Sequence, residues 1–188
     1  MSLELLRKSL LEAPIVKKGE YYYVVHPITD GVPEIKPDLL KELTDEFLKR
    51  IKQCGKIDKI VTVEAMGIPL ATTLSEKMNI PFAIIRKRSY GLPGEVSVEQ
   101  VTGYSKSKLF INGLSKGDSI VIVDDVLSTG GTLRAVLEAL IDIGVKTKGV
   151  FIAIDKGNAA KKIQNESNIP IDALITIDVV KGKIVIKS

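Results

Sequence analysis

The chain has 188 residues, of which 45% are hydrophobic and 27% are charged. This length and composition predict one globular domain and exclude an intrinsically disordered or collagen-like protein. The 27 basic residues exceed the 23 acidic ones by four, which favours anionic ligands only weakly and fits a lysine-rich solvated surface equally well. With Cys54 as the single cysteine and His26 as the single histidine, an internal disulfide and a zinc site built from several Cys or His ligands are excluded.

The sequence contains no feature typical of a membrane or secreted protein. Its apolar runs are far shorter than the ~18 residues that a membrane-spanning helix requires. The first residues, MSLELLRKSLLEA, carry Glu4 and Glu12, unlike a cleavable secretion signal. We therefore expect a cytoplasmic protein with no membrane partner.

Helical and strand patterns alternate along the chain. The apolar residues of Pro37–Ile51 recur at three- and four-residue spacings, as on one face of an amphipathic helix. The same reading predicts strands at Lys59–Val63, Pro81–Ile85, Ser119–Val123 and Gly149–Ile154, and helices at Gly67–Met78 and Thr132–Ile143. Strands that are apolar throughout are buried on both faces. We therefore expect an α/β fold, a twisted and mainly parallel sheet with helices on both faces.

Two parts of the chain do not fit this alternation. Residues 87–108 are polar, contain glycine and predict a long irregular loop, which in a compact domain is usually functional or disordered. The two ends of the chain could pack together as a small accessory lobe. We expect one domain over residues 1–188, with a core at about 37–160 and a lobe from parts of 1–36 and 157–188.

The segment Val121–Thr132, VIVDDVLSTGGT, is the most informative in the chain. It predicts a buried strand that ends in two carboxylates, followed by a turn that opens a helix. The unpaired amides at a helix N-terminus favour an anion, and glycines allow the backbone to approach a phosphate closely. Hydroxyl donors complete a turn that suits a phosphate group. The residues of this turn are Ser128, Thr129, Gly130, Gly131 and Thr132.

Asp124 and Asp125 would repel that phosphate, so they should engage sugar hydroxyls, a magnesium ion or both. A diol beside a terminal phosphate indicates a sugar phosphate as ligand. The alternative is that Asp125 and Ser128 only cap the helix and the glycines only form the turn. That alternative leaves the paired carboxylates at a strand end unexplained.

No lysine follows the second glycine of the turn, as a Walker loop requires, and no G-x-G-x-x-G fingerprint is present. The segment resembles the phosphoribosyl-pyrophosphate (PRPP) signature of type I phosphoribosyltransferases. The resemblance covers most of residues 59–156. It implies a fold with a small hood lobe and a long flexible lid loop, and transfer of ribose 5-phosphate from PRPP to a nitrogenous base with Mg²⁺. It also implies that residues 128–132 hold the 5′-phosphate and that Asp124 and Asp125 hold the ribose diol and the metal.

The resemblance gives further segments a role. The loop Glu64, Ala65, Met66 and Gly67 lies between a strand and a helix, where relatives bind pyrophosphate; the alternative is a plain turn. Arg86, Lys87 and Arg88 would stabilise departing pyrophosphate, although basic runs are usually solvated. Catalytic roles accordingly fall to Asp124, Asp125, Arg86 and Lys87. The segment RKRSYGLPGE resembles the lid of adenine phosphoribosyltransferases, which closes over the substrate.

Three positions depart from the patterns of these enzymes. Met66 stands where the adenine enzymes carry arginine, and Gly103 where they carry a glutamate that helps the base to lose its proton. Ser128 replaces an aspartate of the hypoxanthine-guanine enzymes. The group that manages the purine proton therefore stays open, with Glu95, Glu99 or a water molecule as candidates.

Lys156 follows the predicted strand Gly149–Ile154. Its ammonium is a donor only, so it suits the 6-oxo group of hypoxanthine or guanine and not the 6-amino group of adenine. Its place corresponds to the lysine that reads this group in hypoxanthine-guanine enzymes, and the chain resembles their archaeal branch most. The alternative is a surface lysine that pairs with Asp155.

These observations predict a purine-salvage enzyme that makes IMP or GMP, has PRPP and a purine base as partners, binds no specific nucleic acid and is a homodimer, as the resemblance suggests. Adenine transfer is the nearest alternative, supported by the lid and opposed by Lys156. A non-catalytic PRPP sensor that regulates transcription is an alternative of another class. The chain leaves no room for the separate DNA-binding domain that such a regulator would carry.

Overall fold

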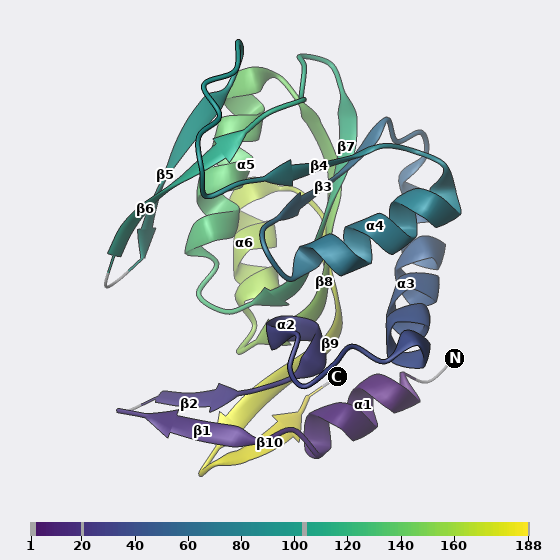
Figure 1. The fold of residues 1–188 in the computed structure, drawn as a ribbon, viewed down its shortest axis with the longest axis vertical. Helices are drawn as coiled ribbons and strands as arrows, with labels where there is room; N and C mark the ends of the chain where they lie inside the picture. Colours follow the sequence, from purple (N-terminus) through teal and green to yellow (C-terminus); the bar gives the residue numbers. More distant parts are fainter. Residues whose placement is uncertain (1–2, 20, 103–104, 188) are drawn as a thin grey trace.

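The computed structural model describes residues 3–19, 21–102 and 105–187. Six strands form one sheet in the order β10-β9-β8-β7-β3-β4 (Figure 1). All neighbours in this sheet are parallel except β9 and β10. The strands are β3 Lys59–Val63, β4 Phe82–Ile85, β7 Ser119–Leu127, β8 Lys146–Lys156, β9 Ile171–Val180 and β10 Lys183–Ile186. The predicted mainly parallel sheet is confirmed.

Helices cover both faces of the sheet, as predicted (Figure 1). One face carries α3 Pro37–Ile51, which continues into the short 3-10 helix η1 Lys52–Cys54, and α4 Gly67–Met78. The other face carries α5 Gly131–Ile143 and α6 Ala159–Ser167. Neighbouring residues of β7 point to opposite faces: Val121 and Val123 belong to the first hydrophobic core, and Ile120 and Ile122 to the second. This double burial explains why the strands are apolar throughout.

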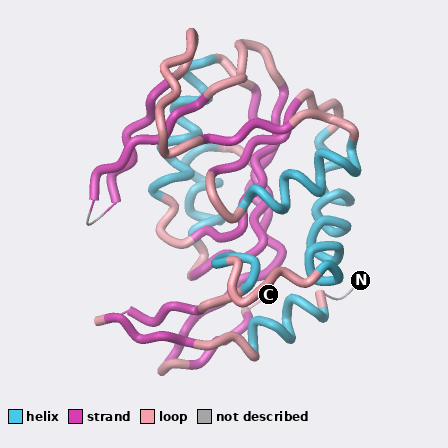
Figure 2. The backbone as a smooth tube through the Cα atoms, viewed as in Figure 1, coloured by secondary structure: helices cyan, strands magenta, loops and turns pink. Residues whose placement is uncertain are grey.

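The N-terminal elements form a small lobe at the lower end of the molecule in Figures 1 and 2, beside the C-terminal hairpin β9–β10. They are α1 Glu4–Leu11, the antiparallel pair β1 Ile15–Lys18 and β2 Tyr21–Val24, and the short helix α2 Pro27–Asp30. Leu6 and Leu10 of α1 are fully buried in the same core as Ile177 of β9. This lobe matches the hood expected from the resemblance, and it places α2 against β7.

Two expectations about local structure were wrong. Strand β7 does not end at the two aspartates but continues to Leu127, because it keeps pairing with β8 as far as Asp155. Much of the segment expected to be irregular is an antiparallel ribbon of β5 Val96–Thr102 and β6 Ser105–Ile111. The ribbon forms because Val98 and Leu109 bury their side chains in the core beside α5. Gly103 and Tyr104 lie outside the described residues.

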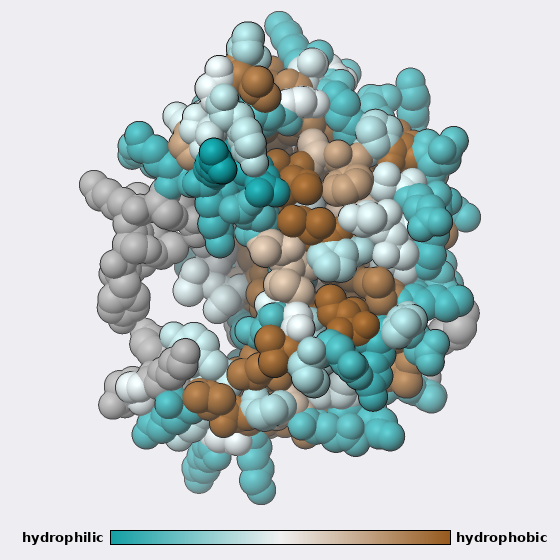
Figure 3. All heavy atoms as spheres, viewed as in Figure 1, coloured by the Kyte–Doolittle hydropathy of each residue, from teal (hydrophilic) through white to brown (hydrophobic). Residues whose placement is uncertain are grey.

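The face of the molecule drawn in Figure 3 carries both apolar and hydrophilic residues. Figure 3 shows apolar residues gathered over the middle of the face, with hydrophilic residues around them. Within the described residues, no helix combines the length and the apolar character needed to cross a bilayer.

Candidate functional site

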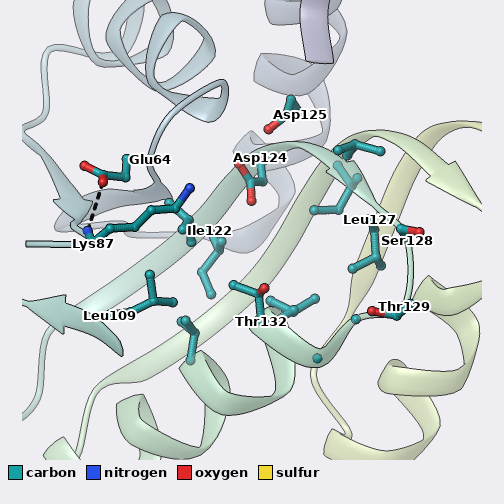
Figure 4. Close-up of a pocket in the computed structure, with 17 residues that line it drawn as sticks. Glu64, Lys87, Leu109, Ile122, Asp124, Asp125, Leu127, Ser128, Thr129 and Thr132 are labelled. Carbon is teal, nitrogen blue, oxygen red and sulfur yellow. Dashed lines mark hydrogen bonds between the residues drawn. The ribbon is translucent and has the colours of Figure 1, made fainter. Parts of the chain in front are cut away.

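A cavity of about 520 Å³ opens where β7 meets the N-terminus of α5. It brings together residues from three segments that the sequence singled out, and Figure 4 shows Asp124 between the Glu64–Lys87 pair and the turn that carries Ser128, Thr129 and Thr132. The candidate residues that line the cavity are Glu64, Lys87, Asp124, Asp125, Ser128, Thr129, Gly130, Gly131 and Thr132. The remaining lining is apolar: Val63, Leu109, Ile122, Val126, Leu127, Leu133, Val136 and Ile152.

The turn before α5 is shaped by Gly130, which adopts a left-handed conformation with φ of 78°. A Cβ atom on Gly130 would lie 2.3 Å from Cδ1 of Ile163 in α6, which no real contact permits. Both constraints require glycine at this position. Helix α5 therefore begins at the wall of the cavity, where its first amide groups favour an anion.

Arg134 contacts both this turn and α6, a role that the sequence did not predict. Its Nη1 donates to the carbonyl oxygen of Thr129 at 3.0 Å, and its Nε donates to Glu166 of α6 at 2.6 Å. The guanidinium thus links the turn to α6. An arginine one turn into an amphipathic helix carries no sequence signal for such a contact, because its partners depend on the packing of α6.

The two carboxylates of β7 are poorly solvated. Burial is the main cause that raises the pKa of Asp125 to about 6. Burial, and next the neighbouring Asp125 carboxylate, raise the pKa of Asp124 well above its usual range. Oδ1 of Asp124 is buried and has no hydrogen-bond partner in the described part of the chain. Such a pair costs stability when ionised, which is typical of a site that awaits hydrogen-bond donors or a cation.

The three predicted cations have different surroundings. Nε of Arg86 lies 2.7 Å from Oε2 of Glu64, so the Arg86 charge is already paired. The backbone amide of Lys87 donates to Oε1 of Glu64 at 3.0 Å, the dashed line in Figure 4, and its side chain lies along the cavity. The guanidinium of Arg88 stacks over the Tyr90 ring at 5.8 Å, and Arg88 does not line the cavity.

The loop from Glu64 to Gly67 leads from β3 into α4. Met66 occupies the N-cap position of α4, and its Cε would lie 3.3 Å from a Cβ placed on Gly31, at the end of α2. The carbonyl of Ala65 accepts the amide of Ile68 at 3.2 Å. Gly67 is the tightest point, because a Cβ there would overlap Thr62 and Asp124 side-chain oxygens. Glu64 is the member of this loop that lines the cavity, whereas Ala65, Met66 and Gly67 do not.

Lys156 is the last residue of β8 and lies close enough to Asp30 of α2 and Asp125 of β7 for their charges to act on it. Partial burial lowers the pKa of its ammonium, while the charges of Asp30 and Asp125 oppose that shift. Asp155 does not pair with it: Oδ1 of Asp155 accepts the amide of Ala159 at 3.1 Å and so caps α6. Asp30 lies 126 positions away in the chain, so no sequence pattern indicates that it lies near Lys156.

His26 is fully buried and serves as the N-cap of α2. Its Nδ1 accepts the amide of Ile28 at 3.2 Å, and its Nε2 lies 2.9 Å from Oγ of Ser9. Burial lowers the pKa of the imidazole to about 4. The ring is a neutral packing residue and not a candidate catalyst.

Neither acidic residue considered for the purine proton has surroundings that suit a base. Glu95 accepts hydrogen bonds from Asn112 Nδ2 at 2.8 Å, Ser89 Oγ at 2.5 Å and the Tyr90 amide at 3.0 Å. These bonds, that of Asn112 first, lower the pKa of Glu95 to about 2, so it takes up no proton near neutral pH. Glu99 is exposed, with Lys108 Nζ 4.0 Å away.

The donor set fits magnesium held jointly by protein and substrate. No group of three His, Cys, Asp or Glu side chains is placed to hold a metal among the described residues, which does not suit a closed protein cage. Mg²⁺ is commonly held by one or two carboxylates together with substrate phosphate oxygens and water. Asp124 and Asp125 at the cavity supply that pair of carboxylates.

Comparison with known proteins identifies the family from the sequence. A family model described as the phosphoribosyl transferase domain matches residues 34–178. The chain is 53% identical to a hypoxanthine/guanine phosphoribosyltransferase of Methanocaldococcus infernus, over 97% of this chain and 99% of the relative. It is also 53% identical to the protein of that name from Methanobacterium paludis, over 98% and 96% of the two chains.

Solved structures of similar fold have far less similar sequences. The adenine phosphoribosyltransferase of Saccharomyces cerevisiae superimposes with a TM-score of 0.74 at 21% identity, over 92% of this chain and 99% of that one. The enzyme of the same name from Leishmania tarentolae gives 0.76 at 18% identity, over 94% and 88%. These structures support the fold.

Proposed function

Because the chain belongs to the phosphoribosyl transferase domain family, we propose that it transfers the 5-phosphoribosyl group of PRPP to hypoxanthine or guanine. The products are IMP or GMP and pyrophosphate, as in purine salvage. One observation carries the choice of base: relatives that are about half identical over nearly the whole chain bear the name hypoxanthine/guanine phosphoribosyltransferase.

The cavity has the two halves that a ribose 5-phosphate needs. We assign the 5′-phosphate to the turn of residues 128–132 at the start of α5, whose amides and hydroxyls donate hydrogen bonds. We assign the ribose hydroxyls to Asp124 and Asp125, whose desolvated carboxylates need donors. The apolar floor, which includes Leu109 and Ile152, excludes water from the sugar.

Asp124 and Asp125 would also contribute to holding Mg²⁺ together with PRPP, consistent with their two-carboxylate donor set. When bound, the ion neutralises charge on the departing pyrophosphate. The protein's own contribution on that side is Lys87, whose side chain lies along the cavity. Arg86 contributes through Glu64: the ion pair between them fixes the loop that we assign, with Ala65, Met66 and Gly67, to pyrophosphate.

Lys156 is the residue that we assign to the 6-oxo group of the purine. It is partly buried on the side of β7 that faces the small lobe, where the charges of Asp30 and Asp125 favour its protonated form. A protonated ammonium donates to a 6-oxo group but finds no acceptor on the 6-amino group of adenine. The assignment rests on this chemistry and on the position of Lys156 at the end of β8.

The direct test is a panel of hypoxanthine, guanine, xanthine and adenine, each incubated with PRPP and Mg²⁺ while nucleotide and pyrophosphate are measured. We expect IMP and GMP to form much faster than AMP. Efficient transfer to adenine alone would contradict the proposed specificity. Absence of product with every base would contradict the enzyme and favour a PRPP sensor, which a gel-shift assay at physiological salt would then test.

The cytoplasmic location and the homodimer stay predictions. Analytical ultracentrifugation at several protein concentrations would determine the oligomeric state.

A further inference from the structure

At the N-terminus of α4, two buried side-chain oxygens lie close to Gly67. They are Oγ1 of Thr62, in β3, and Oδ1 of Asp124, in β7. Neither has a hydrogen-bond partner within the described residues. A Cβ on Gly67 would lie 2.0 Å from the Thr62 oxygen and 2.4 Å from the Asp124 oxygen, so both oxygens border the same small space.

The two oxygens are chemically complementary. A threonine hydroxyl can donate, whereas an ionised carboxylate only accepts. Thr62 is fully buried, so water does not compete for its hydroxyl. Leaving a buried polar group unpaired costs about 1–3 kcal/mol, and a hydrogen bond between the two would remove that cost for both.

We propose that Thr62 is a positioning residue for Asp124: when a ribose is bound, the Thr62 hydroxyl donates to Oδ1, a bond that this structure lacks, and holds the carboxylate in the orientation that accepts a ribose hydroxyl. Gly67 makes this possible because its missing side chain leaves the space between β3 and β7 open. Thr62 does not line the cavity and acts only through Asp124. This inference rests on the proposed function, since it takes the ribose as the ligand of Asp124.

The test is calorimetric titration of the full-length protein with two probes, ribose 5-phosphate and inorganic phosphate. Thr62→Val removes the hydroxyl but keeps the shape of the side chain, and Thr62→Ser keeps the hydroxyl. We expect Thr62→Val to weaken ribose 5-phosphate binding roughly tenfold, the loss expected for one hydrogen bond to a charged group. Inorganic phosphate, which we assign to the turn of residues 128–132 alone, should bind both variants as it binds the wild type, and Thr62→Ser should bind ribose 5-phosphate normally.

Equal weakening of both probes would overturn the proposal, because it would show that Thr62 only supports the fold of the site. Unchanged ribose 5-phosphate binding in Thr62→Val would also overturn it. If Thr62→Val does not fold, a crystal structure of the wild type with ribose 5-phosphate decides: the proposal requires Oγ1 of Thr62 within about 3.2 Å of Oδ1 of Asp124. If the wild type binds no ribose 5-phosphate, the ribose is not the ligand of Asp124 and this inference fails, whereas the panel of bases with PRPP still tests the transfer reaction separately.

Discussion

Replacing Asp125 by asparagine should make the protein more stable at pH 8 while it impairs the proposed activity. Burial raises the pKa of Asp125 from 3.8 to about 6. One pH unit corresponds to 1.36 kcal/mol, so the ionised carboxylate costs the folded state about 3 kcal/mol at pH 8. Asparagine carries no charge and avoids that cost.

The sign of the effect with pH follows from the raised pKa. Above about pH 6 the carboxylate is ionised in both the folded and the unfolded chain, and the full cost applies. As the pH falls from about 6 to 3.8, the folded protein takes up the proton first and the cost disappears. Asp125→Asn should therefore exceed the wild type by about 3 kcal/mol in unfolding free energy at pH 8 and lose that advantage by about pH 4.

The assay is urea unfolding of both proteins at pH 8 and pH 4, with transfer activity measured at pH 8. Asp118→Asn is a matched control, because the hydrogen bond from Lys59, first among its causes, lowers the pKa of Asp118 and makes that carboxylate stabilising. The control should lose stability at pH 8. The reasoning is refuted if Asp125→Asn is less stable than the wild type at pH 8, or if its effect is the same at both pH values.

Three further outcomes are expected. Burial lowers the pKa of His26 to about 4, so below pH 6.5 the unfolded chain binds a proton that the folded chain does not. The unfolding free energy of the wild type should therefore fall by about 3 kcal/mol between pH 6.5 and pH 4 relative to that of His26→Asn, as measured by unfolding curves across this range. An equal pH dependence in the two proteins would contradict this prediction. Gly130→Ala should lower the melting temperature and weaken the binding of inorganic phosphate at least tenfold in calorimetry, because the new Cβ meets Ile163 and a φ of 78° is unfavourable for alanine. Phosphate binding as tight as that of the wild type would contradict the assignment of phosphate to this turn. Lys156→Ala should reduce kcat/KM for hypoxanthine by roughly 10- to 100-fold and leave the slow reaction with adenine nearly unchanged, and equal losses for both bases would remove the specificity argument.

The layered core could be predicted because strands that are buried on both faces consist of continuous apolar residues, a pattern visible in the sequence. Strands such as Lys59–Val63 and Ser119–Val123 are continuous apolar runs, and the helix Pro37–Ile51 has a clear stripe. The β5–β6 ribbon was not predicted, because polar residues surround Val98 and Leu109, which pair across the two strands and bury one side of the ribbon. The end of β7 was misplaced because charged residues usually end a strand, whereas here pairing with β8 continues past them.

The candidate site shows the same division. The sequence indicated the turn of residues 128–132 and the paired carboxylates as neighbours at one cavity because they are contiguous in the chain. The roles of Arg134, Asp30 and Thr62 depend on contacts between distant segments, which no spacing rule encodes. The same holds for the cluster Arg86, Lys87 and Arg88, where pairing with Glu64 and stacking on Tyr90 engage two of the three charges, contacts that the sequence does not indicate.

The central claim is that one end of the cavity holds sugar hydroxyls through Asp124 and Asp125 while the turn before α5 holds the phosphate. Calorimetric titration of PRPP with Mg²⁺ into the wild type and into the Asp124→Asn/Asp125→Asn double variant tests it most directly. Loss of two hydrogen bonds to charged groups, each about 1.5 kcal/mol, predicts roughly 100-fold weaker binding by the double variant. PRPP binding of equal affinity in the two proteins would contradict the account.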